Sequence, residues 1–280
     1  MTAGARIHPV MVPWVVLGNF VGKLYLQRNL IRNFVVRDLK ARFIGSFMGF
    51  FWSVINPVVL IVSYYFVFSV IFPQKPQPEW GTDYFSLFLF CSILPWLFFQ
   101  DTLQRSSTII VDNANLVTKT IFPTEILPLT VMLASLVNHL IGFVILMAVI
   151  LFVLGKVSLA ILFVPVYLFI LMLFTLGLAW FISSLNVFVR DISQVLGVVL
   201  TFWFWFTPIF YTGTKFPEEY TFIVRWNPLA HFVAGYRDCL LRMRMPDLHI
   251  LALLGLGSLA VFVAGGLFFR YIKREFVDVL

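Results

Sequence analysis

One apolar run constrains this chain more than any other feature of its sequence. The 29 residues from Ile44 to Phe72 carry no formal charge. A helix of about 20 apolar residues crosses the ~30 Å hydrocarbon core of a bilayer, so this run is long enough to span it. The block just before it, residues 37–42, holds three cations and one acid, and such cationic flanks are retained on the cytoplasmic side of membranes. The run therefore predicts a transmembrane helix whose start faces the cytoplasm.

The composition agrees with a polytopic membrane protein. Apolar residues make up 61% of the 280 residues and charged residues 12%, which excludes an ordinary soluble domain. A net charge of +7 would suggest nucleic acid as a partner of a soluble protein, but seven of the 20 Lys and Arg residues precede residue 44. Their position indicates cytoplasmic retention and contact with anionic membrane lipid, and we expect no nucleic acid partner.

The hydrophobic pattern predicts an all-α polytopic membrane protein with six transmembrane helices. An N-terminal extension (1–23) precedes an amphipathic helix at the membrane interface (24–43), and the transmembrane domain occupies 44–280. Pro57 is expected to kink the first span or to mark the end of an interfacial turn, and Gly177 to permit close helix packing. The six predicted spans are residues 48–72, 84–100, 126–154, 159–189, 192–207 and 248–269.

Residues 208–247 are too polar to span and too apolar for an ordinary loop. Asn227 and Pro228 have the pattern of a helix start, an N-cap followed by proline at the first helical position. We expect short re-entrant helices here, lying against protein or a cavity. The five cations of this segment argue against the outside position that alternation of six spans gives it. The basic flanks of both termini, in contrast, favour cytoplasmic termini.

The sequence offers little for catalysis or metal binding. His139, beside Asn138, lies in the third predicted span, where a lone histidine is more often a helix–helix hydrogen-bonding residue than a catalytic base. Cys91 and Cys239 give no disulfide framework and no metal spacing. The stretch Gly18–Leu24 is one residue short of a phosphate-binding loop and lacks its Ser/Thr. We expect no catalytic residue, metal site or cofactor in this chain, so energy for uphill transport must come from another chain.

Aromatic residues make up 18% of the chain and cluster near prolines at predicted span ends. One interpretation is that they form interfacial belts and pack between helices. Aromatic faces also offer weakly polar surfaces on which sugar rings can slide without tight binding. The candidates for lining a conduit are Tyr64, Tyr65, Trp96, Phe99, Trp203 and Phe206.

Several short motifs occur in order from about residue 28 to the C-terminus. The first is a basic block followed by a small residue, a Gly-x-x-Trp and a proline: Arg37, Asp38, Leu39, Lys40, Arg42, Phe43, Ser46, Gly49, Trp52 and Pro57. The others are Leu94–Trp96, the joint of Asn186 with Arg190 and Asp191, Phe206–Tyr211, and Asn227 with Pro228. Together these motifs resemble the permease subunits of ABC-2-type exporters, in the branch that exports O-antigen, capsule or teichoic acid.

The resemblance implies a transport subunit, not an enzyme. It implies a homodimer in the inner membrane with both termini cytoplasmic, bound to two copies of a separate subunit that binds ATP and Mg²⁺. An export channel at the dimer interface would carry a polysaccharide or lipid-linked glycan. The implied ATPase contacts lie on the amphipathic helix and the loop Asp101–Glu125, with these candidates: Arg32, Arg37, Asp38, Lys40, Arg42, Asn113, Asn115 and Lys119. The implied outer gate follows the fifth span, with candidates Pro208, Tyr211, Asn227 and Pro228.

Two alternatives stay open from the sequence. An ABC-2 permease for a small amphiphile or drug would share the fold and would differ in pore width and aromatic lining. A membrane-embedded glycosyl or acyl transferase would need acids or histidines that converge near an interface, and the sequence does not offer such a group.

Overall fold

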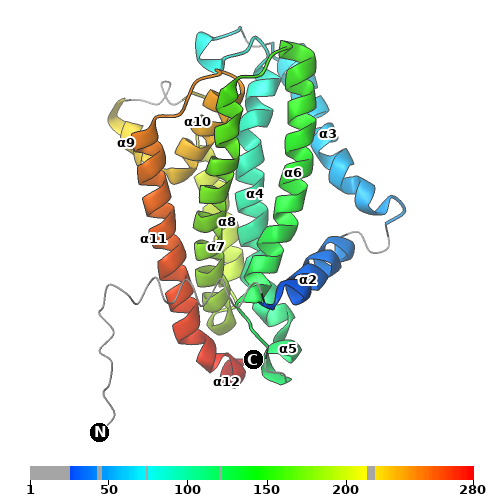
Figure 1. The fold of residues 1–280 in the computed structure, drawn as a ribbon, viewed down its shortest axis with the longest axis vertical. Coiled ribbons are helices and arrows are strands. Elements are labelled where there is room, and N and C mark those ends of the chain that lie inside the picture. Colours follow the sequence, from blue (N-terminus) through cyan, green and yellow to red (C-terminus); the bar gives the residue numbers. More distant parts are fainter. Residues whose placement is uncertain (1–25, 43–45, 74, 120–121, 213–217) are drawn as a thin grey trace.

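The computed structural model describes residues 26–42, 46–73, 75–119, 122–212 and 218–280. Most of these residues are helical, and none of them forms a strand. The helices form one elongated bundle, with α2 (Arg28–Ala41) and α12 (Phe276–Val279) at one end and α10 (Pro228–Leu240) toward the other (Figure 1). We call these the α2 end and the α10 end. The predicted extension 1–23 lies outside the described residues.

Within the described residues, five helical segments are long and apolar enough to cross a membrane. They are η1 (Gly49–Phe51) with α3 (Trp52–Tyr65) and the π-helical η2 (Phe66–Ile71); η3 (Pro78–Trp80) with α4 (Phe85–Asp112); α6 (Ile126–Leu154); η4 (Leu159–Phe163) with α7 (Val164–Phe188); and α11 (Leu248–Ile272) with η7 (Lys273–Glu275) and α12. The shorter elements are α5 (Ala114–Lys119), α8 (Ile192–Phe206), η6 (Glu218–Tyr220), α9 (Thr221–Trp226) and α10.

The predicted fifth span corresponds to α8, which is apolar but has 15 residues. At 1.5 Å per residue this helix is about 22 Å long, short of a ~30 Å hydrocarbon core. It begins beside α4, where Gln104 Nε2 lies 3.4 Å from the Ser193 carbonyl oxygen, and it ends beside Asn227 at the start of α10. The count of six spans and the re-entrant arrangement of α9 and α10 stay predictions.

Contacts between distant segments define the two ends of the bundle. At the α2 end, Lys273 Nζ lies 2.9 Å from Glu125 Oε2, so the C-terminal segment lies next to the start of α6. At the α10 end, Arg242 Nε donates to the Glu79 carbonyl oxygen at 2.7 Å. This relative placement agrees with the predicted alternation of loops, whereas the side of the membrane on which each end lies stays a prediction.

α4 continues well past the predicted second span. The sequence analysis ended that span at residue 100 and began a polar loop there, yet the helix runs to Asp112. The reason is that the polar side chains in this part of the helix find partners. Thr108 Oγ1 donates to Asp112 Oδ2 at 2.8 Å, while Asp101 and Arg105 lie one turn apart and contact α2. The helix therefore continues past the predicted end of the span because these side chains find partners far away in sequence, whereas the end of the membrane-spanning part stays a prediction.

α4 is also the central helix of the bundle. Between Phe85 and Phe99 nearly every residue is buried, and the helix packs against α3, α6, α7, α8 and α10. A helix that is apolar all round belongs inside a bundle. α3, in contrast to α4, is mostly exposed, and Ser53 is its one buried residue. Toward η1 the helix leans away from the bundle (Figure 1).

α7 and α11 approach each other closely at a pair of glycines. A Cβ atom at Gly177 would lie 2.5 Å from the Val261 carbonyl oxygen, and one at Gly265 would overlap the Gly177 backbone. Small residues let the backbones of membrane helices pack together. The expectation that Gly177 permits close packing is confirmed.

Gly265→Ala should destabilise the bundle because the added methyl group forces α7 and α11 apart. Overpacking of this kind costs about 1–3 kcal/mol, which would lower the Tm of a chain this size by roughly 2–10 °C. Thermal unfolding in detergent measures the effect. Gly257→Ala on the same helix is the matched control, since nothing lies within 4 Å of a Cβ atom there. Equal Tm values for the two variants would contradict the close approach.

Candidate functional site

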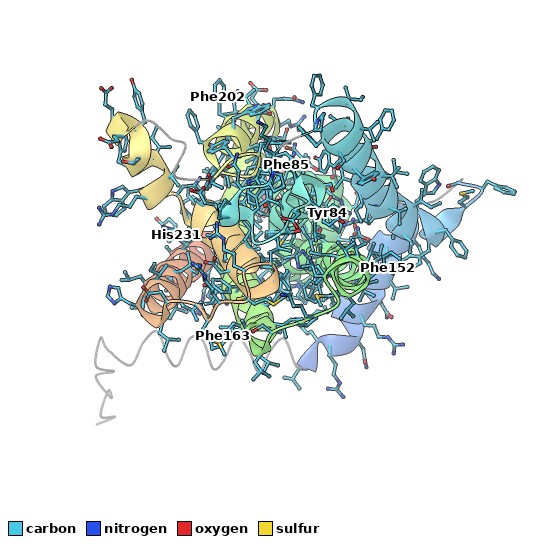
Figure 2. All side chains as sticks on the ribbon, turned by 90° about the horizontal axis from the view of Figure 1, so that it is seen from above. Tyr84, Phe85, Phe152, Phe163, Phe202 and His231 are labelled. Atoms are coloured by element: carbon cyan, nitrogen blue, oxygen red, sulfur yellow. The ribbon has the colours of Figure 1, made fainter. Side chains whose placement is uncertain are left out.

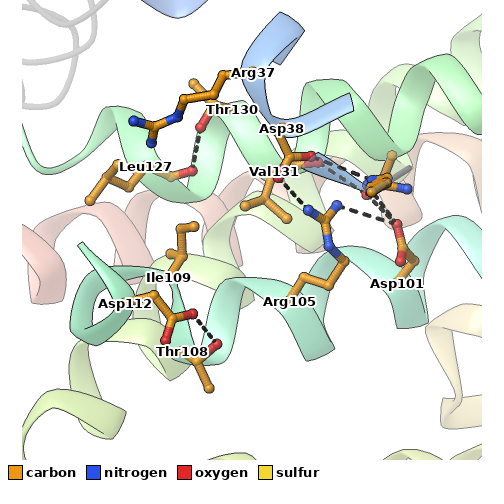
Figure 3. Close-up of polar contacts among 12 residues, drawn as sticks. Arg37, Asp38, Asp101, Arg105, Thr108, Ile109, Asp112, Leu127, Thr130 and Val131 are labelled. Carbon is orange, nitrogen blue, oxygen red and sulfur yellow. Dashed lines mark hydrogen bonds and ion pairs between the residues drawn. The ribbon is translucent and has the colours of Figure 1, made fainter. Parts of the chain in front are cut away.

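The α2 end holds crossed ion pairs between α2 and α4. An aspartate and an arginine lie four residues apart at each helix: Asp38 on α2 with Arg42 as its C-cap, and Asp101 with Arg105 on α4. Arg105 pairs with Asp38, and Arg42 Nη2 lies 3.1 Å from Asp101 Oδ2. Figure 3 shows Arg105 between Asp38 and Asp101. Each acid therefore binds the arginine of the other helix.

Ser135 of α6 extends this contact to a third helix. Its hydroxyl donates to Asp101 Oδ2 at 2.6 Å and accepts from Arg42 Nη2 at 3.2 Å. We call Asp38, Arg42, Asp101, Arg105 and Ser135 the ionic cluster. Burial raises the pKa of Asp38, and the charge and hydrogen bond of Arg42 and the charge of Arg37 oppose that shift. Loss of one arginine would leave each acid with only one of its two cationic partners, and removing one partner is the costly way to break such a partly buried set of pairs.

The remaining predicted ATPase contacts lie around the ionic cluster. Arg32 and Lys40 are exposed on α2, as is Asn115 on α5. Arg37 is also exposed, and it donates to Asn113 Oδ1 at 3.1 Å, which joins α2 to the segment after α4. Lys119 ends α5. The structure thus brings α2 and α5 to one end of the bundle, with cations on the exposed face of α2.

Two of the six predicted conduit residues lie in the protomer core. Trp96 and Phe99 of α4 are at most 1% exposed. Phe99 contacts Phe174 of α7 and Trp203 of α8, with ring centroids 5.9 and 5.2 Å away. Trp96 packs against Phe204 at 5.4 Å. These aromatic rings join α4, α7 and α8.

The other conduit candidates are more exposed. Phe206 is 42% and Tyr65 51% exposed, whereas Tyr64 and Trp203 are partly buried. Tyr64 packs edge-on against Phe210, which brings α3 next to the residues that follow α8. Seen from above, α3 and α8 lie along one edge of the molecule, where Phe202 is labelled (Figure 2). We call the exposed apolar surface of these two helices the α3–α8 flank. The conduit role of all six residues stays a prediction.

Asn227 joins the predicted outer gate to α8. Its Oδ1 accepts from Leu229 N at 3.0 Å as the N-cap of α10 and from Trp203 Nε1 at 2.9 Å. Its Nδ2 donates to Thr207 Oγ1 at 3.0 Å and to the Phe206 carbonyl oxygen at 3.3 Å. One buried amide therefore fixes the start of α10 on the end of α8.

The other gate candidates lie in the same region. Pro228 is the first residue of α10, as the N-cap pattern predicted. Pro208 is buried in the segment that leaves α8, and the Tyr211 hydroxyl donates to the Trp205 carbonyl oxygen at 2.7 Å. We call residues 207–212 the gate connection. The predicted gate residue set is thus brought together, although its gating role stays a prediction.

His139 connects three helices by hydrogen bonds. Its Nδ1 lies 3.3 Å from the Leu94 carbonyl oxygen of α4, and its Nε2 lies 3.1 Å from the Tyr236 hydroxyl of α10. The ring is buried and also packs edge-on against Phe98. This geometry supports the helix–helix interpretation that the sequence favoured.

The sequence analysis missed that two arginines of the α10 end, the buried Arg237 and the partly buried Arg242, bind protein groups. Arg237 is 3% exposed, and Arg242 binds the Glu79 carbonyl oxygen and Asp238. Both had counted among the five cations that argued against an outside position for 208–247. The positive-inside rule concerns cations in solvated loops. Two arginines that bind protein groups are therefore weak evidence against an outside position for 208–247. Arg237 directly follows Tyr236, a buried residue of α10. This aromatic neighbour is the sequence feature that could have indicated that Arg237 is buried. A third cation, Lys215, lies outside the described residues.

Comparisons with known proteins identify the family of this chain. Residues 29–241 match the family model described as ABC-2 type transporter. The chain is 29% identical over 265 residues to the O-antigen export system permease protein RfbA of Myxococcus xanthus, covering 92% of this chain and 98% of that protein. It is 29% identical over 248 residues to the protein of the same name from Klebsiella pneumoniae, covering 87% of this chain and 92% of that protein. Because the family model covers more than half of the sequence, the chain belongs to the ABC-2 type transporter family.

Proposed function

We propose that this chain is the transmembrane permease subunit of an ATP-driven exporter. It moves a polysaccharide, carried on a lipid, across the inner (cytoplasmic) membrane through a channel at a homodimer interface. The observation that carries the proposal is the likeness to permeases named for O-antigen export over 92% and 87% of the chain. Five long apolar segments are consistent with a multi-pass protein.

In this proposal the energy comes from two copies of a separate ATP-binding subunit. The sequence encodes no phosphate-binding loop of its own. The exposed cations of α2, together with α5, offer a docking surface at the α2 end, which we place on the cytoplasmic side. The ionic cluster then passes movement of α2 to the buried α4, because a cross-linked set of ion pairs makes the two helices move together.

We place the dimer interface and conduit on the α3–α8 flank. The exposed residues of α3, η2 and α8 are apolar or weakly polar, and no Asp, Glu, Lys or Arg occurs within 49–71 or 192–206. A long glycan cannot cross hydrocarbon uncovered, because its hydroxyls would lose water without replacement. Two copies that face each other across this flank would enclose a path lined by aromatic rings, with Trp96 and Phe99 supporting it from inside each protomer.

Deleting this chain should leave the glycan inside the cell, and restoring it should return the glycan to the surface. Surface polysaccharide detected on intact cells is the measurement. In proteoliposomes the chain alone should hydrolyse no ATP, and hydrolysis should require the ATP-binding subunit. Unchanged surface glycan in the deletion strain, together with ATP-dependent efflux of a small amphiphile, would favour the drug or lipid exporter instead.

Reversing one charge of the ionic cluster should uncouple export from ATP hydrolysis. Asp38→Arg places a third cation beside Arg42 and Arg105, so we expect glycan export per ATP to fall about tenfold, as for a broken partly buried pair. Adding Arg105→Asp restores opposite charges between α2 and α4 and should recover most of the loss.

The matched control for this charge reversal is Asp112→Asn. This acid lies exposed on the same helix, bonded to Thr108 and outside the cluster, and its loss should leave export per ATP unchanged. If Asp38→Arg exports like the parent complex, or if the reversed pair recovers nothing, the crossed pairs do not carry the coupling.

Phe206→Ala should reduce glycan export several-fold while dimer assembly and ATP hydrolysis persist. Phe206 is chosen over Trp203 because Trp203 also bonds to Asn227 and its loss would disturb the gate connection. Phe152→Ala is the control, since this ring is 93% exposed on a different side of the molecule (Figure 2). Equal export by both variants would assign the exposed aromatics to lipid contact.

A further inference from the structure

The α10 end contains a buried guanidinium whose partners are neutral. Arg237 lies inside the bundle, where its Nε donates to Ser92 Oγ at 2.6 Å and its Nη2 to the Ile209 carbonyl oxygen at 2.8 Å. The guanidinium carbon lies 3.8 Å from the centroid of the Phe88 ring. Among the described residues no carboxylate forms an ion pair with it, because the adjacent Asp238 binds Arg242 at 2.8 Å.

Burial of this guanidinium lowers the stability of the fold, and such a cost argues for a specific role of the residue. Taking a charged group out of water is costly unless hydrogen bonds replace the hydration shell. A structural position between apolar helices would be filled at lower cost by leucine or methionine. Arginine differs from lysine in its rigid fork, which reaches two acceptors in different directions at once. Here the two acceptors belong to separate segments of the chain.

The fork connects three segments that meet at the predicted gate. Arg237 belongs to α10, Ser92 to the buried part of α4, and Ile209 to the gate connection. The Ser92 hydroxyl donates its proton to the Phe88 carbonyl oxygen at 2.5 Å. The lone pairs of Ser92 Oγ are therefore available to accept the hydrogen bond from Arg237 Nε. Ile209 is fully buried, so its carbonyl group would lose a partner if the arginine withdrew.

We propose that Arg237 is the positioning residue of the outer gate, a latch that holds the gate connection against α4 in the closed state. This inference rests on the proposed export function and assigns regulation to the same conduit. α8 carries an exposed apolar face, whereas nearly every residue of α4 between Phe85 and Phe99 is buried. The gate connection can therefore move outward with α8, away from α10, only if the bond between Arg237 and Ile209 breaks and Asn227 releases Trp203 and Thr207. α10 and α4 then keep the arginine through Ser92.

The test measures how often the gate connection opens. Cysteine replaces Tyr211, which is partly exposed, in a chain that lacks Cys91 and Cys239. The permease in complex with its ATP-binding subunit is placed in lipid nanodiscs, where a charged maleimide reaches both faces. The rate of labelling without nucleotide reports the open fraction. Arg237→Met should raise that rate about tenfold, the effect of losing one hydrogen bond to a charged group.

Two further variants separate a latch from simple packing. Ser92→Ala keeps the arginine but removes one acceptor, so labelling should rise in the same direction. In the double variant, labelling should be no faster than with Arg237→Met alone, because both changes break one connection. Arg237→Lys keeps the charge without the fork and should fall between the parent and Arg237→Met. If Arg237→Met does not assemble, the labelling rate of Ser92→Ala decides whether Arg237 acts as a latch.

Arg242→Met is the matched control, since Arg242 follows α10 and bonds to Glu79 and Asp238. It should leave labelling of the gate connection unchanged. Equal acceleration by Arg242→Met would mean general loosening of α10 and would overturn the latch, as would parental labelling rates in Ser92→Ala and Arg237→Met. The readout does not depend on glycan export. A latch effect in a chain whose deletion leaves surface glycan unchanged would therefore reject the export function and keep the latch.

Discussion

Hydrocarbon offers no hydrogen-bond partner, so a polar group buried in a membrane protein is stabilised chiefly by partners within the protein. The rest of the structure depends on how α4 meets that demand. Toward the α2 end its Asp101 and Arg105 bind α2 and α6. In the middle the Leu94 carbonyl group meets His139 of α6. Toward the α10 end Ser92 meets Arg237 of α10. One buried helix thus carries three polar junctions, and these fix which neighbours lie against it.

The distribution of polar contacts around α4 also indicates which helices can move relative to it. α3 and α8 meet α4 mainly through apolar and aromatic contacts such as that of Trp96 with Phe204. Apolar surfaces in a bilayer slide at little cost, since lipid tails replace the lost contacts. In the proposed exporter, movement of α2 is transmitted through the ion pairs, whereas Asn227 and the gate connection restrain α8 at its far end. A force that starts at the α2 end would then reach the α10 end along α4 without deforming it.

Apolar length and spacing predicted most of the fold, because a long uncharged run in a helix has few other uses. The third span matches α6 at both bounds, and the N-cap at Asn227 begins α10 as expected. The polar contacts could not be predicted. Asp101 looked like the start of a loop because its partner, Arg42, is 59 residues away. Arg237 looked like a loop cation because Ser92 is 145 residues away. Aromatic composition likewise could not distinguish the enclosed Phe99 from the exposed Phe206.

The placement of charge suits the passage of a neutral polymer. The charged residues of the ionic cluster, together with Arg237 and Arg242, bind protein groups at the two ends of the bundle. The helices of the α3–α8 flank contain no Asp, Glu, Lys or Arg. A fixed charge on a conduit would bind hydroxyl groups or anionic sugars strongly and would retain each repeat. Aromatic rings attract sugar faces weakly and without preference for one register, so a long chain can advance. In the proposed exporter, the charged residues of the ionic cluster and Arg237 therefore control the positions of the helices, whereas the helices that line the conduit carry no charge.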